Sequence, residues 1–172
     1  KVSAKYINDF THLISNNYLR NKDNTYSPEK ENITPYFESH NSKTFWSFYW
    51  EPNVLVDNKT GALIDDKRLI GTITSRPLHI EIINKGETFD VNYIDFLCVD
   101  KNFRKKNIAP QLIQTHEYNQ CHLNPKICVS LFKREEELTG IVPITVYTTF
   151  CFNMGKWNQP LQLEPQITLL VG

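Results

Sequence analysis

The hydrophobic positions between Val2 and Tyr18 recur every three or four residues, as they do on one face of a helix. They are Tyr6, Ile7, Phe10, Leu13, Ile14 and Tyr18. We therefore expect an amphipathic helix over this stretch. The next stretch, Leu19–Asn32, is polar and shows no period, which predicts an exposed loop. A short helix is expected over Thr34–His40, because Thr34 is a suitable N-cap and proline suits the first helical position.

The pattern changes between Phe45 and Val99 to short runs of β-branched and aromatic residues, separated by turn-forming residues. These runs predict strands whose connections are short enough for antiparallel hairpins. The expected strands are Thr44–Trp50, Gly61–Ile64, Arg68–Ser75, Leu78–Ile83 and Val91–Val99.

A basic loop and a helix over Ile108–His122 follow the last of these strands, and this order is half of a crossover unit. One face of the helix is expected to carry Ile108, Leu112, Ile113 and His116. Further strands are expected over Lys126–Phe132 and Ile141–Phe152, on either side of the charged run Lys133–Glu137. Together these elements predict a mixed α/β (α+β) protein, with a central, mostly antiparallel sheet and flanking helices.

Composition narrows the class of protein. A chain of 172 residues is long enough for one domain, so we expect a single domain over residues 1–172. The 19 basic and 19 acidic residues cancel, which argues against nucleic acid as a partner. No apolar stretch reaches the roughly 20 residues of a transmembrane helix and no signal pattern is present, so we expect a cytoplasmic protein. Because the chain begins at Lys1 and its single methionine is Met154, we expect an excerpt of a longer protein.

The cysteines and histidines do not predict a metal site or a nucleophile. The cysteines are Cys98, Cys121, Cys128 and Cys151. They lack paired C-x-x-C spacing, which favours reduced packing residues. His116 and His122 are six positions apart and fall on different faces of their helix, so no bound metal is expected. Cys98 lies within a strand without a histidine or aspartate at a suggestive spacing, which argues against covalent catalysis.

The segment Tyr93–Ile113 carries the most informative chemistry. It places four cations between a strand and a helix, whose first N–H groups have no partners within the helix. These cations are Lys101, Arg104, Lys105 and Lys106. Such a bend suits a pyrophosphate group. A solvated basic turn fits the local spacing equally well, and the glycines of a dinucleotide or P-loop site are absent.

The same segment resembles a known family. The run from Phe96 to Asp100, F-L-C-V-D, is followed by Arg104, Lys106 and then Ala109-Pro110. This order resembles the N-myristoyltransferase (glycylpeptide N-tetradecanoyltransferase) motif, in which F-L-C-V precedes a basic R-x-K loop and a helix. Weaker similarity extends over roughly residues 6–160. Its other parts are Asn16–Tyr18, Asp23-Asn24, Leu69–Ser75 and Thr139–Pro143.

The resemblance implies the acyl-CoA-binding N-terminal half of such an enzyme, with a GNAT-like acyltransferase fold. Myristoyl-CoA would be the co-substrate, and the N-terminal glycine amine of a protein or peptide would attack its thioester directly. The resemblance assigns an oxyanion hole to the backbone amides of Phe96 and Leu97, which requires the strand to splay or bulge at Phe96. The implied CoA phosphate contacts, largely from the main chain, are Arg104, Lys105, Lys106, Asn107, Ile108 and Ala109.

This sequence departs from the family in two ways that bear on catalysis. The family has asparagine where this chain has Asp95, near the attacking amine; an acid there could attract an ammonium group, accept its proton or pair with a lysine. Thr139, or alternatively Thr148, matches the family threonine near the amine. The second half of the family enzymes, whose terminal carboxylate acts as the base, does not fit within Lys1–Gly172.

Three functions therefore stay open. The first is transfer of a fatty acyl group to a protein N-terminus. The second is a noncatalytic relative with a binding or structural role, which the absent second half favours. The third is an acetyl-CoA-dependent N-acetyltransferase, against which the absence of a Gly-x-Gly or Gly-x-Ala loop weighs.

Overall fold

The computed structural model describes residues 3–19, 26–56, 59–61, 63–133 and 142–146. The chain divides into two compact units, Lys1–Lys133 and Arg134–Gly172. All the helices and strands described belong to the first unit. They are α1 (Ala4–Asn17), α2 (Lys30–Ile33), η1 (Thr34–Phe37), β1 (Phe45–Val56), β2 (Leu63–Ile82), β3 (Glu87–Val99), η2 (Lys101–Phe103), α3 (Ile108–Leu123) and β4 (Ser130–Phe132). The expectation of a single domain over residues 1–172 stays a prediction.

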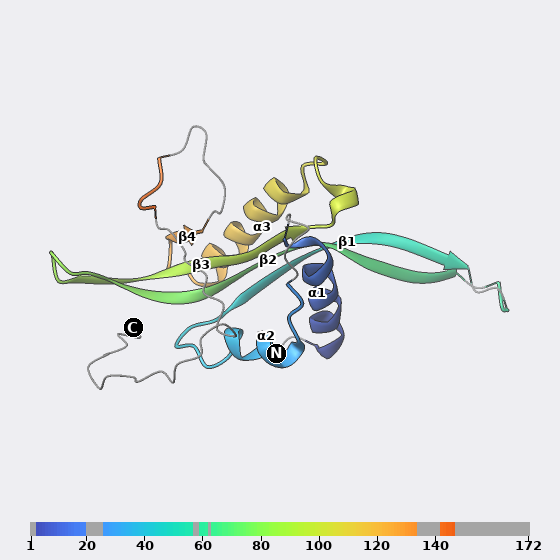
Figure 1. The fold of residues 1–172 in the computed structure, drawn as a ribbon, viewed down its shortest axis with the longest axis horizontal. Helices are drawn as coiled ribbons and strands as arrows, with labels where there is room; N and C mark the ends of the chain where they lie inside the picture. Colours follow the sequence, from blue (N-terminus) through green and yellow to red (C-terminus); the bar gives the residue numbers. More distant parts are fainter. Residues whose placement is uncertain (1–2, 20–25, 57–58, 62, 134–141, 147–172) are drawn as a thin grey trace, which may run out of the picture. The chain divides into compact units, whose positions relative to one another are not determined.

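The strands form one sheet in the order β1-β2-β3-β4 (Figure 1). β1, β2 and β3 pair antiparallel, whereas β4 pairs parallel to β3. The parallel pair follows from the crossover through α3, because a helix between two strands returns the chain to the same end of the sheet. The predicted class, a mixed α/β protein with a mostly antiparallel sheet and flanking helices, is confirmed.

β2 is one long strand where the sequence pattern predicted three shorter ones. Pro77 lies inside it, a position that normally ends a strand. The register explains why it is tolerated: β1 pairs with β2 only as far as Ser75, so beyond that residue β2 has no described strand on its β1 side. A proline there removes no ladder hydrogen bond. The pattern of residues alone does not reveal which edge of a strand is open.

The short second helix begins one turn earlier than predicted. α2 starts at Lys30, inside the stretch predicted to be a loop, and Thr34 ends this helix instead of capping its beginning. The Thr34 hydroxyl donates to the Lys30 carbonyl oxygen at 2.9 Å. Pro35 lies in the first turn of η1, as expected of a proline at a helix start.

The two faces of the sheet are covered by different helices. α1 and α2 lie on one face and α3 on the other (Figure 1). The buried positions of α3 recur every fourth residue, and they are Ile108, Leu112, His116 and Gln120. The prediction that Ile113 belongs to this face is wrong: its side chain is 41% exposed, because each further residue turns the helix by about 100°.

The first turn of α3 packs directly on the sheet. This close packing fixes the position of the bend that precedes α3. A Cβ atom at Gly71 of β2 would lie 2.9 Å from Cδ1 of Leu112 and 3.2 Å from Cγ2 of Ile108. Only glycine allows the backbones to approach so closely.

The second unit is described only at residues 142–146, which form no strand. The predicted strand Ile141–Phe152 is therefore wrong for these residues, and its remainder lies outside the described residues. Within the described ranges, no helix has the length and apolar character needed to cross a bilayer.

Candidate functional site

β3 contains a bulge at the position where the resemblance requires one. Thr72 pairs with Cys98 and Thr74 pairs with Asp95, so that two residues, Phe96 and Leu97, lie opposite Ile73 alone. Phe96 adopts a left-handed backbone conformation, with φ of 48°. Such a conformation is unusual for a bulky residue and marks a locally constrained backbone.

The bulge shifts the alternation of side chains along β3. Before it, Ile94 packs in the cluster under α3; after it, Leu97 packs against that same cluster. Phe96 belongs to the cluster under α1 and α2. The extra residue therefore turns two consecutive side chains, Asp95 and Phe96, toward the α1 side of the sheet.

Among the described residues, the β3–β4 ladder reaches as far as the start of the bulge. The last pair in this part of the chain is Ile94 with Phe132. Phe96 N–H donates to Oδ1 of its neighbour Asp95 at 2.9 Å. This amide, the first of the two expected in an oxyanion hole, therefore bonds to a carboxylate oxygen and not to another strand.

Asp95 is held by more than the Phe96 amide. The hydroxyl of Tyr36 donates to its Oδ2 at 2.8 Å. The guanidinium carbon of Arg76 lies 4.4 Å from the centre of the Tyr36 ring and 4.9 Å from that of Tyr93. Burial, together with the hydrogen bond to Asp95 and its charge, raises the pKa of Tyr36 to about 12, although Arg76 acts in the opposite direction. Tyr36 therefore stays a hydrogen-bond donor across the physiological pH range.

Aromatic rings cover the bulge on the α1 side. The Phe96 ring is the centre of this aromatic cluster, with ring centroids 5.5 to 6.4 Å away. Its partners are Phe10, Tyr18, Tyr26, Tyr36 and Phe37. Burial and the charge of Asp95 raise the pKa of Tyr26. The cluster makes a largely buried aromatic environment around the Phe96 side chain.

The predicted phosphate-binding bend is exposed between η2 and α3. Lys105 and Asn107 have positive φ values of 63° and 62°, and Asn107 directly precedes α3. The side chains of Lys105, Lys106 and Asn107 are exposed, whereas the Ile108 side chain is buried between α3 and the sheet. Ile108 could therefore contribute to a ligand site only through its main chain.

Two cations of the bend have structural contacts that the sequence did not predict. Arg104 donates through Nη2 to the carbonyl oxygen of Asn17 at 2.6 Å and through Nε to that of Val99 at 3.3 Å. The ammonium group of Lys106 lies 4.5 Å from the centre of the Phe103 ring. Arg104 thus joins the end of α1 to the end of β3, in addition to any ligand contact.

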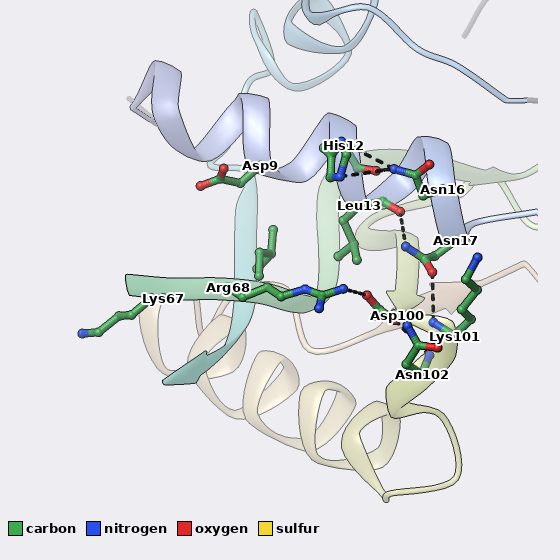
Figure 2. A pocket seen from close by; sticks show the side chains of 11 residues that line it. Asp9, His12, Leu13, Asn16, Asn17, Lys67, Arg68, Asp100, Lys101 and Asn102 are labelled. Atoms are coloured by element: carbon green, nitrogen blue, oxygen red, sulfur yellow. Dashed lines mark hydrogen bonds and ion pairs between the residues drawn. The ribbon is translucent and has the colours of Figure 1, made fainter. Parts of the chain in front are cut away.

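A groove of about 530 Å³ lies beside the bend, between α1, β2 and the start of η2 (Figure 2). Its charged residues have both signs: Asp9 and Asp100 on one hand, and Lys67, Arg68 and Lys101 on the other. Arg68 and Asp100 form an ion pair at 2.6 Å. None of the predicted acyl-CoA contacts from Arg104 to Ala109 lines this groove, although Lys101, a cation of the same bend, does.

Asn17 connects the groove to the bend. Its side-chain amide donates to the Leu13 carbonyl oxygen at 3.0 Å, and its Oδ1 accepts from the Lys101 N–H at 2.9 Å (Figure 2). Asp100 accepts from the Asn102 N–H at 2.9 Å and is the N-cap of η2. The end of α1 therefore positions the chain that enters the bend.

We expect Asn17→Ala to lower the free energy of unfolding by about 1 to 3 kcal/mol, because the substitution leaves the Lys101 N–H without its acceptor. The neighbouring Asn16 is exposed and, among the described residues, bonds to His12 within α1, so Asn16→Ala should cost less than about 0.5 kcal/mol. Urea denaturation of both variants checks the difference. Equal losses in the two variants would mean that the contact between α1 and Lys101 contributes nothing to the free energy of unfolding.

Several site residues were missed from the sequence. Tyr36 and Arg76 are 59 and 19 positions from Asp95, and no local pattern indicates such contacts. Asn17 lies in the Asn16–Tyr18 stretch that resembles the family, but its role became apparent only from its contacts. The predicted Thr139, and the alternative Thr148, lie outside the described residues.

The Cys98 thiol is poorly suited to act as a nucleophile. Burial raises the pKa of Cys98 to about 12, and the charge of Asp100 adds to this effect while Arg104 opposes it. Its thiol is therefore protonated and unreactive. Cys98, Cys121 and Cys128 are free thiols, and Cys151 lies outside the described residues. The described part of the chain contains no group of three histidine, cysteine or acidic side chains able to hold a metal ion.

Solved structures with this arrangement include N-acyltransferases. Saccharomyces cerevisiae N-myristoyltransferase with bound myristoyl-CoA superposes with a TM-score of 0.51 at 23% identity, over 77% of this chain and 27% of that one. A GNAT family acetyltransferase from Staphylococcus aureus gives 0.50 at 16% identity, over 88% of this chain and 95% of that one. The fold is therefore that of the GNAT-like N-acyltransferases.

The sequence match is more specific. Residues 2–132 match the family described as "Myristoyl-CoA:protein N-myristoyltransferase, N-terminal domain", and the chain belongs to this family. A glycylpeptide N-tetradecanoyltransferase from Kluyveromyces lactis is 31% identical over 111 residues, which are 64% of this chain. The aligned region covers 22% of that relative. The resemblance stated from the F-L-C-V segment is confirmed.

Proposed function

We propose that this chain binds a long-chain acyl-CoA, specifically myristoyl-CoA, and presents its thioester to the N-terminal glycine amine of a protein or peptide. The chain spans about a fifth of the length of its curated relative, so the activity of the whole enzyme is itself part of the proposal. The observation that carries it is the bulge at Phe96, which follows the last described β3–β4 pair and lies beside a cluster of aromatic rings.

Each part of the site would bind a different part of the acyl-CoA. The exposed main chain of the bend and the first turn of α3 would bind the CoA phosphates, with Lys105 and Lys106 adding charge. The thioester oxygen would lie against the Phe96 and Leu97 amides, and removal of one such donor typically costs about 3 to 4 kcal/mol in the transition state. The acyl chain would lie in an apolar cleft.

The reaction would need no covalent enzyme intermediate. The amine lone pair would attack the thioester carbon, the C–S bond would break, and CoA would leave as the thiolate while the nitrogen loses its proton. Asp95 is adjacent to the proposed oxyanion site, where a carboxylate favours an ammonium group and could accept that proton. Thr139 would lie near the same amine.

A second candidate is an acyl-CoA-binding protein without turnover. One observation favours it: the Phe96 amide, which transfer would require, bonds to the Asp95 carboxylate. The two candidates share the binding site and differ only in whether the acyl group leaves CoA.

The test is an incubation of the full chain with myristoyl-CoA and a peptide that begins with glycine. Because the chain has free thiols, the product should be followed by the mass of the peptide and not by released thiol. We expect myristoylated peptide to form, and none to form when the glycine is N-acetylated or when acetyl-CoA replaces myristoyl-CoA. Binding of myristoyl-CoA without product would favour the second candidate, and acetylated peptide would favour an acetyltransferase.

A further inference from the structure

The Asp95 carboxylate occupies a position that the proposed reaction requires for another oxygen. Its Oδ1 accepts the Phe96 N–H at 2.9 Å. An amide N–H directed at one oxygen with good geometry cannot serve a second oxygen equally well. A thioester oxygen and the Asp95 carboxylate would therefore compete for the same donor.

The surroundings hold the carboxylate in this position from its other side. The Tyr36 hydroxyl donates to Oδ2 at 2.8 Å. Tyr36 is fixed in turn by ring contacts with Phe37 and Phe96 and by the guanidinium group of Arg76. Both carboxylate oxygens thus have a partner, one from the main chain of β3 and one from η1.

The bulge explains how one side chain reaches its own neighbour's amide. In a regular strand Asp95 and Phe96 would face opposite sides of the sheet. At the bulge, Phe96 and Leu97 lie opposite Ile73 alone. The side chains of Asp95 and Phe96 are therefore both on the α1 side instead. The same backbone irregularity that frees the amide from the sheet therefore delivers a carboxylate to it.

We propose that Asp95 acts as a displaceable plug of the oxyanion site: its carboxylate must leave the Phe96 amide before an acyl-CoA thioester oxygen can bind there. This inference rests on the proposed function, which supplies the thioester. It adds a blocking role for Asp95 and a positioning role for Tyr36, which holds the plug in place.

The test compares two ligands that differ only in the competing oxygen. Myristoyl-CoA has the thioester carbonyl, whereas S-tetradecyl-CoA has a CH₂ group in its place. Both carry the same phosphates and the same chain length, so the general effect of removing a negative charge from the protein cancels between them. Dissociation constants should be measured without an acceptor peptide, for wild type, Asp95→Ala, Tyr36→Phe and the control Asp90→Ala.

We expect Asp95→Ala to strengthen binding of myristoyl-CoA about tenfold more than binding of S-tetradecyl-CoA, since a hydrogen bond to a charged group no longer has to be broken. Tyr36→Phe should give a smaller gain in the same direction, because it removes one of the two contacts of the plug. Asp90 is on the same strand, and its carboxylate contacts His79. Asp90→Ala should therefore leave the ratio of the two dissociation constants unchanged.

Equal gains for the two ligands in Asp95→Ala, or no gain for either, would overturn the plug while leaving acyl-CoA binding intact. Failure of wild type and all variants to bind either ligand would instead overturn the proposed function. Thermal unfolding of each variant establishes that it is folded before binding is measured.

Discussion

Replacing Phe96 with alanine is expected to lower the free energy of unfolding by about 3 to 5 kcal/mol, the usual cost of removing a buried phenylalanine ring. Phe96 is 8% exposed and contacts five aromatic rings, from α1, from η1 and from the residues between α1 and α2. Alanine keeps a Cβ atom, so the strain of the left-handed backbone is not relieved while the packing is lost.

The control for this substitution is Phe89→Ala. Phe89 is on the same strand and 39% exposed, so its loss should cost much less, about 1 kcal/mol. Urea denaturation followed by circular dichroism measures both. Similar losses for the two variants would mean that the aromatic cluster does not stabilise the bulge.

The second large effect is a dependence of stability on acidic pH that originates at His116. Its side chain is 1% exposed between α3 and the sheet. Nδ1 bonds to the Ser47 hydroxyl at 2.8 Å and Nε2 to the Ser75 hydroxyl at 3.0 Å. Burial lowers the pKa of His116 from 6.5 to about 4, although the charge of Glu117 raises it slightly.

The direction of the effect follows from the protons bound in each state. Between pH 6.5 and 4 the unfolded chain protonates this histidine and the folded chain does not. The free energy of unfolding therefore keeps its full value above pH 6.5 and falls as the pH drops toward 4, by about 3 kcal/mol in total. Denaturation curves from pH 7.5 to 4 should record this fall.

Two variants distinguish the contribution of His116 to this pH dependence from the contributions of other titrating groups. His116→Gln should be less stable than wild type at neutral pH and should lose less stability on acidification. His79→Gln, which removes an exposed histidine, is the matched control. A wild-type slope in His116→Gln would place the acid sensitivity elsewhere.

The sequence predicted the parts of the fold that depend on local pattern. α1 and α3 were found within two residues of their ends, because their apolar spacing is regular. The bulge at Phe96 was predicted from the family resemblance and is present. It could not have been derived from periodicity, since a single extra residue does not disturb the apolar run around it.

The parts that were not predicted depend on contacts between distant residues. Pro77 lies within β2 because β1 is too short to reach it, and strand length is a property of the sheet. Arg104 resembled a phosphate ligand, but its guanidinium group bonds to the end of α1. Asp95 was considered as a partner for lysine, yet its contacts in the described structure are a tyrosine hydroxyl and a main-chain amide.

The central claim is that the bulge in β3 and the bend before α3 form one site for an acyl-CoA. It is tested most directly by titrating the ¹⁵N-labelled chain with myristoyl-CoA while recording amide resonances. We expect the Phe96 and Leu97 resonances and those of residues 105–109 to shift together at the same ligand concentration. Binding that leaves the bulge resonances unchanged, or no binding at all, would contradict the claim.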